Sequence, residues 1–426
     1  MRPEAEGEPT SPHQLVDHLF RNSAGQMVAW LTRVFGPAHL EIVEEVVQDA
    51  LVKALQQWPY SGVPDNPAGW LFRVARNGAL DVLRRSSSFQ TRAHEIALEL
   101  QRAADGPEPG DLTIEDDELR MVFMCCHPAL PQDARVALSL KTVGGFSVAE
   151  IARAFLTSES AIAQRLVRAK RALRDHRVGL ELPGDKDLAA RLDSVLEVIY
   201  LLFNEGYSTH AGENLVRHDL CGEALRLGRL VAMSPRIGAD SAPAAHALVA
   251  LIALQSARLP ARIDGRGELV LLEDQDRSRW SQPLVAMGFA HFERSAEGST
   301  VTPYHVQAAI AALHARAETL EATRWPEIAA LYDQLAALNP SPVVLLNRAV
   351  AISRVHGPAA ALAAIAPLEQ PLAEYFLLHC VKGRLLADVG DPAAAAAAYR
   401  AALERPCSDP ERRFVQRRIA ELKSPL

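Results

Sequence analysis

The chain has 426 residues, which is too long for a single hydrophobic core, so we expect two to four domains. Hydrophobic residues make up 49% and charged residues 23%, as in an ordinary folded protein, and the net charge of −7 excludes a protein that is basic throughout. We find no apolar run of membrane-spanning length and no apolar core near the amino terminus, so we expect neither a membrane anchor nor a signal peptide. The five scattered cysteines fit a reducing compartment, and we expect a cytoplasmic protein.

The first predicted domain, residues 10–86, consists of helices. Apolar residues recur at helical spacing in three stretches, 13–21, 24–35 and 40–58. A segment rich in Pro and Gly then ends this pattern. Asn66 is a favoured helix cap and Pro67 is favoured at the first helical position, so a fourth helix is expected to begin there and to end near Arg85.

An acidic segment, residues 87–117, separates this domain from the next one. It contains Pro and Gly, and its carboxylates repel one another and would repel nucleic acid. We therefore expect an extended linker here.

The second predicted domain, residues 118–178, contains a helix-turn-helix. Two helices are expected over 119–129 and 131–140. Ser147 with Glu150 three residues later forms a capping box at the start of a short helix. Ser158 caps a longer helix with a basic end, and this succession is the helix-turn-helix outline. The turn lacks Gly, which costs on the order of 1 kcal/mol if one of its residues is left-handed, so we expect a widened turn.

The rest of the chain is predicted to be helical with one interruption. In residues 187–300, Asp264-Gly265 favours a turn and Glu268–Leu272 favours a short β-segment. In residues 301–426, prolines spaced 32 and 34 residues apart each open an Ala-rich helix: Pro326, Pro358 and Pro392. A period near 34 is typical of tetratricopeptide repeats. The predicted fold class is all-α, with two small helical domains and a helical-repeat domain that has one short β-prone insertion.

Several motifs occur in an order that resembles a known family. Glu45–Leu51 and Trp70–Arg85 resemble the two parts of region 2 of the sigma-70 family of RNA polymerase sigma factors. The helix-turn-helix at 147–174 resembles region 4, and no room remains between them for a region 3 domain. The chain thus resembles the extracytoplasmic-function sigma factors, in particular the subgroup with a long extension of tetratricopeptide-like repeats. Asn204–Tyr207 and Leu271–Trp280 resemble strings in that extension.

The resemblance implies that the helix over 40–58 docks on the coiled coil of the largest polymerase subunit. Polar residues on this otherwise apolar helix suit a charged partner: Glu45, Gln48 and Asp49. The alternative interpretation is a solvent-facing edge of a helical core.

The resemblance also implies that the helix over 70–85 binds the −10 element of a promoter. Arginine fits phosphate bidentately and asparagine reads a base edge, and both types lie on one flank: Arg73, Arg76, Asn77, Arg84 and Arg85. The loop Tyr60–Asn66 lies where the family captures an unstacked base. The alternative is a plain solvated basic face, and we interpret Trp70 as a core residue.

In the helix-turn-helix, the start of the second helix would face the major groove at the −35 element, and basic residues further along would contact phosphates. The expected contact residues are Ser158, Glu159, Ser160, Ala161, Gln164, Arg165, Arg168, Lys170 and Arg171. The expected core residues of this helix are Ile162, Leu166, Val167 and Leu173.

Two clusters suggest a metal site but are better explained otherwise. Cysteines adjacent on a helix point in different directions, and no second ligand pair follows Cys125-Cys126-His127, so a buried core helix is favoured. The acidic string over 273–276 could hold a cation, but Arg277 and Arg279 beside it favour internal ion pairs. We expect no metal and no cofactor. The chain also has no P-loop, nucleophile elbow or His-Glu-x-x-His motif, so we do not expect an enzyme.

The predicted function is that of a sigma factor which binds core RNA polymerase, directs promoter recognition and DNA opening, and is regulated by its carboxyl-terminal extension. A protein or peptide partner of the repeats fits their expected concave surface. One alternative is a helix-turn-helix regulator with a repeat-type ligand or partner-binding domain, which would leave the region 2 motifs unexplained. Another is a hydrolase or metal enzyme built on residues 186–300.

Overall fold

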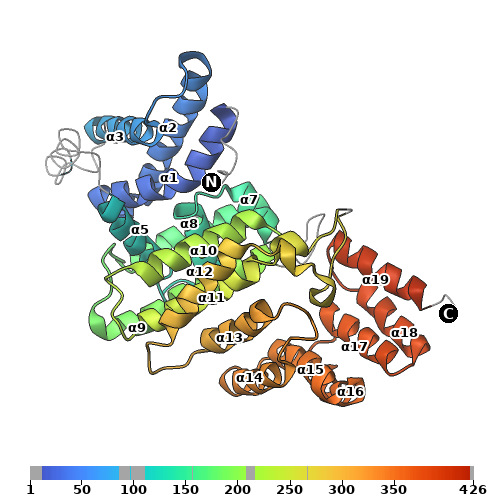
Figure 1. Cartoon of the computed structure of the whole chain (residues 1–426). Coiled ribbons are helices and arrows are strands. Elements are labelled where there is room, and N and C mark those ends of the chain that lie inside the picture. The colour runs from blue at the N-terminus through green and yellow to red at the C-terminus, as the bar shows by residue number, and fades with distance from the viewer. Residues whose placement is uncertain are drawn as a thin grey trace, which may run out of the picture. The chain divides into compact units, whose positions relative to one another are not determined.

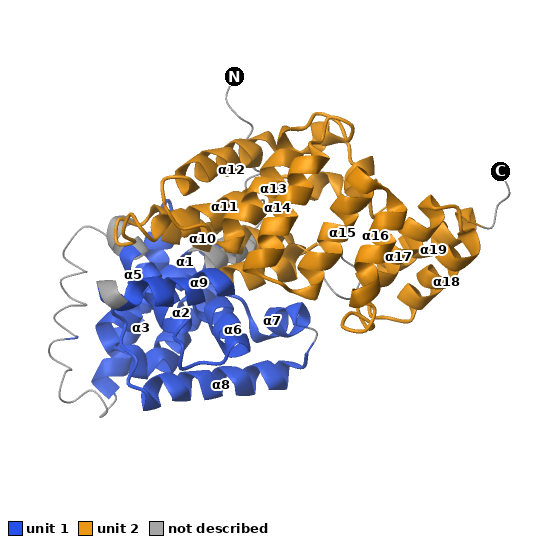
Figure 2. Cartoon of the chain, turned by 90° about the horizontal axis from the view of Figure 1, so that it is seen from below, with its two compact units in different colours: residues 1–198 blue, residues 199–426 orange. Residues whose placement is uncertain are grey.

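The computed structural model describes residues 12–85, 96, 111–155, 157–207, 216–265 and 267–422. All regular elements in this part of the chain are helices, and its β pairing is confined to one isolated antiparallel bridge between Ile263 and Leu269. The prediction of an all-α fold is confirmed. The chain divides into two compact units, residues 1–198 and 199–426, which Figure 2 shows in two colours.

The first part of unit 1 is a bundle of three long helices (Figure 1): α1 (Pro12–Phe35), α2 (Leu40–Ser61) and α3 (Pro67–Arg85). A short 3-10 turn, η1 (Pro37–His39), joins α1 to α2. The bundle buries large apolar side chains such as Met27, Trp58 and Leu71. α3 begins as predicted, because the Asn66 side-chain oxygen accepts a hydrogen bond from the Gly69 amide at 2.9 Å.

The second part of unit 1 contains the predicted helix-turn-helix. Its helices are α5 (Asp111–Cys125), α6 (Gln132–Thr142), α7 (Val148–Ala154) and α8 (Glu159–Asp175). The capping box is confirmed: Ser147 Oγ accepts from the Glu150 amide at 3.1 Å, and the Glu150 carboxylate accepts from the Ser147 amide at 2.8 Å. Ser158 caps α8 through the Ala161 amide at 3.2 Å. In the turn, Phe155 has a φ of −94°, while Leu156 lies outside the described residues.

The prediction of two separate helices over 13–21 and 24–35 is wrong, because α1 runs through both stretches without a break. Gly25, near the start of the second stretch, lies against the end of α6. A Cβ atom at Gly25 would lie 1.9 Å from the carbonyl oxygen of Val143, so only a residue without a side chain lets α1 approach the end of α6 so closely.

The prediction of an extended linker is wrong at its carboxyl end, since α5 already begins at Asp111. Asp117 is almost fully buried, and its carboxylate accepts a hydrogen bond from Arg33 of α1 at 2.9 Å. Burial raises the pKa of Asp117, and the Arg33 hydrogen bond opposes that rise. The neighbouring Asp116 pairs with Arg120. Because arginines neutralise these two carboxylates, charge repulsion does not keep this part of the segment extended. Residues 87–110, except Ile96, lie outside the described residues.

The boundary between the units falls inside α9 (Asp185–Tyr207), at Val198, whereas the sequence suggested a junction near 186. The first half of α9 belongs to unit 1 because Leu188 and Leu192 are buried. In addition, Arg191 donates a hydrogen bond to the carbonyl oxygen of Phe123 at 2.7 Å. The extension therefore begins as a continuation of the second helical part of unit 1.

The first part of unit 2 packs helices around one that is buried on all sides, α11. The helices are α10 (His218–Met233), α11 (Ala242–Ser256), α12 (Gln282–Ser295) and α13 (Pro303–Arg316). The stretch Ala242–Ala261 is long and apolar enough to cross a membrane, contrary to our expectation from the sequence, but 78% of it is buried inside the fold. α10, α12 and α13 all contact α11. This stretch has the surroundings of a core helix.

The predicted interruption between α11 and α12 is present, although its β character is limited to the single bridge. Gly267 in this turn has a φ of +76°, in the left-handed region, so a side chain there would be strained. The segment otherwise forms short 3-10 turns: η3 (Leu259–Ala261), η4 (Leu272–Asp274) and η5 (Arg277–Arg279).

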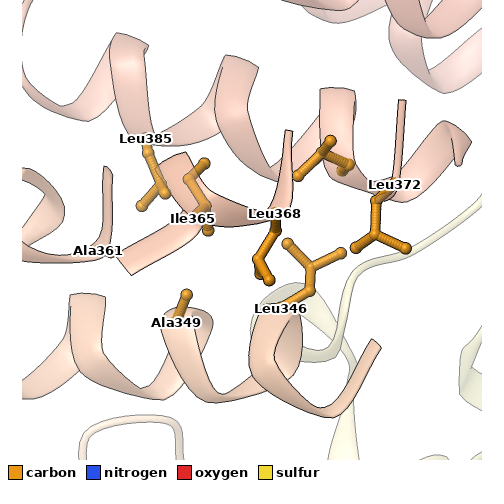
Figure 3. Packing of buried hydrophobic residues seen from close by; sticks show 8 residues of the cluster. Leu346, Ala349, Ala361, Ile365, Leu368, Leu372 and Leu385 are labelled. Carbon is orange, nitrogen blue, oxygen red and sulfur yellow. The ribbon is translucent and has the colours of Figure 1, made fainter. Parts of the chain in front are cut away.

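The remainder of unit 2 consists of antiparallel helices stacked in chain order. They are α14 (Trp325–Leu338), α15 (Pro342–His356), α16 (Pro358–Ile365), η6 (Ala366–Leu368), α17 (Phe376–Asp388), α18 (Pro392–Leu403) and α19 (Asp409–Glu421). The three prolines each stand at the start of a helix, as predicted. Figure 3 shows how Leu346 and Ala349 of α15 pack against Ile365 of α16 and Leu385 of α17. Neighbouring helices thus share one core.

Candidate nucleic-acid interface

The residues expected to contact polymerase lie together on the exposed side of α2. Glu45, Gln48 and Asp49 are exposed, while Val46 and Val47 between them are buried in the bundle. Spacings of three and four residues place the exposed side chains on one face of the helix. Val52, 43% exposed, continues this face one turn later. Our sequence analysis missed it, although its spacing of seven residues from Glu45 was a usable signal.

The residues expected to contact the −10 element form a basic face on α3. Arg73, Asn77, Arg84 and Arg85 are exposed, and Arg76 is half-buried. Arg76 donates a hydrogen bond to the Asn77 side chain at 3.3 Å, and Arg84 pairs with Asp81 at 3.4 Å. The opposite face of α3 buries Leu71, Ala75, Ala79 and Leu83. The arginines of α3 and the Asn77 side-chain amide therefore lie on the solvent-facing side of the helix.

Beside this face, the end of α2 and the loop after it present apolar side chains to solvent. Tyr60 is 92% exposed and Val63 is 38% exposed. Trp70 is half-buried and packs edge-to-face on buried Trp58, with ring centroids 5.5 Å apart. Trp70 therefore belongs to the core packing, as predicted, whereas the Tyr60 ring is open to solvent.

The exposed face of α8 includes most of the residues expected to contact the −35 element. Ser158, Glu159, Ser160, Gln164, Arg168 and Arg171 are exposed, and Ala161 is half-buried. Ile162, Leu166 and Leu173 are buried, as expected. The placement of Val167 in the core is wrong, because its side chain is 58% exposed. Together with Ala163, Gln164 and Arg168 it lines a shallow apolar depression on the outer face of α8.

Two of the expected basic contacts are held by carboxylates within unit 1. Arg165 pairs with Asp133 of α6 at 3.1 Å. Lys170 donates a hydrogen bond to Glu44 of α2 at 2.5 Å, and both side chains are mostly buried, 12% and 16% exposed. By contrast, Arg171 makes an exposed pair with Asp175 at 3.6 Å. Arg168 is exposed as well, and its guanidinium donates a hydrogen bond to the carbonyl oxygen of Gln164 at 3.4 Å.

The Glu44–Lys170 pair lies where the two parts of unit 1 meet. Glu44 also accepts a hydrogen bond from the hydroxyl of Thr142, at 3.5 Å. A second and more exposed pair, Arg174 with Glu41 at 3.5 Å, also joins α8 to α2. The helix that carries the face expected to contact polymerase therefore binds α8 through its neighbouring face.

The cysteines expected in a core helix are in the core. Cys125 and Cys126 are fully buried, and burial raises the pKa of Cys126 to about 12. Within the residues that the structure describes, no three His, Cys, Asp or Glu side chains are grouped as metal ligands would be.

The acidic string of unit 2 forms an ion-pair network, but with other partners than the sequence suggested. Glu273 binds Arg354 of α15 and Arg384 of α17. Arg277 instead donates hydrogen bonds to backbone carbonyls at the end of α13. The prediction of pairs with Arg277 and Arg279 is wrong, because these two guanidinium groups bind backbone carbonyl oxygens, Arg279 that of Pro260.

Comparison with known proteins agrees with this arrangement. The family model of sigma-70 region 2 matches residues 19–89, and that of sigma-70 region 4 matches residues 120–173. Residues 191–296 match a family described as a family of unknown function, DUF6596.

Three relatives cover different parts of the chain. The uncharacterized protein R00370 of Rhizobium meliloti is 41% identical over 416 residues, which are 96% of both chains. The ECF RNA polymerase sigma-E factor of Escherichia coli K12 is 28% identical over 137 residues, 31% of this chain and 71% of that protein. The probable RNA polymerase sigma factor RfaY of Xanthomonas campestris is 29% identical over 133 residues, 31% of this chain and 33% of that protein.

No solved structure is significantly similar to the chain. The region 2 and region 4 matches nevertheless fall on α1–α3 and α5–α8, the two parts of unit 1 that carry the exposed faces described above. The relative that covers 96% of the chain also shares the extension. The chain therefore belongs to the sigma-70 family, as an extracytoplasmic-function RNA polymerase sigma factor, not itself an enzyme, with a long helical carboxyl-terminal extension.

Proposed function

We propose that this sigma factor docks on core RNA polymerase through α2, opens the −10 element with α3 and the loop before it, and recognises the −35 element with α8. The observation that carries this proposal is the exposure of the three expected faces on one unit, each backed by a buried apolar face. The protein would act in the cytoplasm, where promoter DNA and polymerase are found.

The polymerase contact is tested by charge reversal on α2. Asp49→Lys leaves the buried face of the helix untouched, so the fold should be unchanged by circular dichroism while binding of core polymerase is abolished. Asp240→Lys is the matched control, since Asp240 is an equally exposed carboxylate in unit 2. Normal polymerase binding by the Asp49 variant would argue instead for a helix-turn-helix regulator that acts without the sigma contacts.

The proposed −35 interface on α8 has two kinds of contact, one with phosphates and one with base edges. Arg168 lies where it can contact phosphate, so Arg168→Ala should weaken binding to every DNA sequence. The slope of log affinity against log salt concentration should become shallower by about 0.9 for each phosphate that is no longer neutralised. Gln164 can read a base edge, so Gln164→Ala should reduce discrimination between promoters by roughly 1–3 kcal/mol. Fluorescence anisotropy with cognate and scrambled duplexes at several salt concentrations separates the two roles. Variants that change only protein stability would refute the assignment.

We further propose that the extension regulates the sigma unit and that its stacked helices are tetratricopeptide-like. The support is the regular opening of α14, α16 and α18 by proline, and the concave surface that stacked helix pairs generate for protein or peptide partners. A chain that ends at Tyr207 keeps all of unit 1, and its promoter output in transcription with purified polymerase should differ from that of the full chain. Equal output would show that the extension is not a regulator.

A further inference from the structure

The stacked helices of unit 2 line a partly open cavity of about 320 Å³. One wall is formed by α15, α17, α18 and α19, and the other by the segment Leu271–Glu273 that crosses them. This volume lies at the lower end of the range for small-molecule sites, about 300–1,000 Å³. The lining is mainly apolar and aromatic, with side chains that include Leu271, Trp325, Leu377, Val381, Tyr399 and Phe414.

The cavity is held open by an ion pair that the chain makes with itself. Glu273 projects from the crossing segment and binds Arg354 of α15 and Arg384 of α17. Burial alone would raise the pKa of Glu273, but the hydrogen bonds and charges of the two arginines outweigh it and lower the pKa. The crossing segment is thus pinned to two helices while an unfilled space remains beneath it. A long peptide has no open path along this surface, because the chain's own segment lies across it.

The charges of the lining do not cancel. Arg354, Arg384 and Arg418 face Glu273 and Asp388, which gives three positive against two negative charges, a net charge of +1. The guanidinium of Arg418 lies over the Phe414 ring, 5.2 Å from its centroid. Its carboxylate partner, Glu421, is 3.1 Å away, half-exposed, and not part of the lining. An exposed pair of this kind contributes little, so Arg418 can exchange Glu421 for an anion inside the cavity.

We propose that this cavity binds a small amphipathic organic anion, with its aromatic or aliphatic body between Val381 and Tyr399 and its single carboxylate at Arg418. The ligand would replace no contact of Glu273, and it would bury apolar surface that the cavity now leaves uncovered. This site goes beyond the proposed roles in polymerase and promoter binding.

The test is calorimetric titration of the full chain with 2-naphthoate, an aromatic body that carries one carboxylate. We expect one saturable site per chain, and binding of the neutral methyl ester weaker by about fivefold or more, since the ester lacks the charge that meets Arg418. Arg418→Gln should weaken naphthoate binding to a similar extent and should abolish the preference over the ester. Arg400→Gln on α18 is the matched control, because Arg400 is exposed and does not line the cavity.

A second variant fills the space itself. Val381→Phe should abolish binding of both the acid and the ester, and thermal unfolding shows whether the variant is folded. Absence of a saturable site in the full chain would overturn the proposal, as would binding that Arg418→Gln leaves unchanged. The titration contains neither DNA nor polymerase, so its failure is distinguishable from a failure of the proposed function.

Discussion

The Glu44–Lys170 pair predicts that unit 1 weakens its own binding to −35 DNA, because Glu44 holds the Lys170 ammonium group. Lys170 cannot contact a phosphate while its ammonium group is bound to Glu44, so DNA binding through Lys170 requires that pair to break. Glu44→Gln removes the charge that holds Lys170 and leaves a side chain of nearly the same size. The variant should therefore bind a −35 duplex more tightly than the natural protein in the absence of polymerase.

The expected gain follows from the burial of the pair. Removal of one partner from a fully buried ion pair costs about 3–5 kcal/mol, whereas an exposed pair contributes about 0–1 kcal/mol. With 12% and 16% of the two side chains exposed, we take a value of about 2 kcal/mol. This corresponds to a gain in DNA affinity of roughly 30-fold at most. Glu41 and Arg174 join the same two helices with 53% and 39% of their side chains exposed, so Glu41→Gln should change affinity less than about fivefold.

Fluorescence anisotropy of a labelled −35 duplex at low salt measures both variants under the same conditions. The double variant Glu44→Gln with Lys170→Gln should not show the gain, because the released ammonium group is then absent. Unchanged or weaker DNA binding by Glu44→Gln would refute the reasoning. An equal effect of Glu41→Gln would also do so, because removal of negative charge from α2 would then explain the result.

Other consequences concern packing and protonation. Gly25→Ala should lower the midpoint of thermal unfolding, with a loss of about 1–3 kcal/mol, because its Cβ would collide with the Val143 carbonyl; an unchanged midpoint would contradict the close approach of α1 and α6. Val167→Ala should leave the midpoint of thermal unfolding nearly unchanged because the side chain is exposed, yet it should weaken binding to a −35 duplex, as measured by fluorescence anisotropy. A large loss of stability would show instead that Val167 is a core residue. Burial, and then the neighbouring His246 and nearby arginines, lower the pKa of His291 from 6.5 to about 4. Between those pH values the unfolded chain binds a proton that the folded chain does not, so stability should fall as the pH falls, by up to about 1.4 kcal/mol per pH unit. Denaturant unfolding at pH 7 and pH 5 measures this dependence, and His291→Gln should reduce it.

Features of the fold that depend on neighbouring residues could be predicted from the sequence. Contacts between segments far apart in the chain could not. Asn66 and Ser147 begin helices through hydrogen bonds to amides three residues away, so their roles can be read from the sequence. Val167 was misplaced because an apolar residue beside buried Leu166 can face either way until its neighbours are known. Asp117 was assigned to a linker because its partner, Arg33, lies 84 residues earlier in the chain. The three proposed interfaces were assigned by resemblance, and the internal pairing of Lys170 and Glu44 had no local signal.

The burial of α11 has a consequence for how the protein is made. This helix has no polar face, and α12 and α13, which cover it, end only at Arg316. While the ribosome synthesises the chain, a segment apolar enough to resemble a membrane span therefore has α10 beside it but lacks the cover of α12 and α13 until some sixty more residues have been made. Chains that end between Ser256 and Arg316 should be retained by chaperones or degraded, whereas removal of the residues after Arg316 leaves α11 covered. A chain shortened from its carboxyl end thus keeps α11 covered only if it still contains α13.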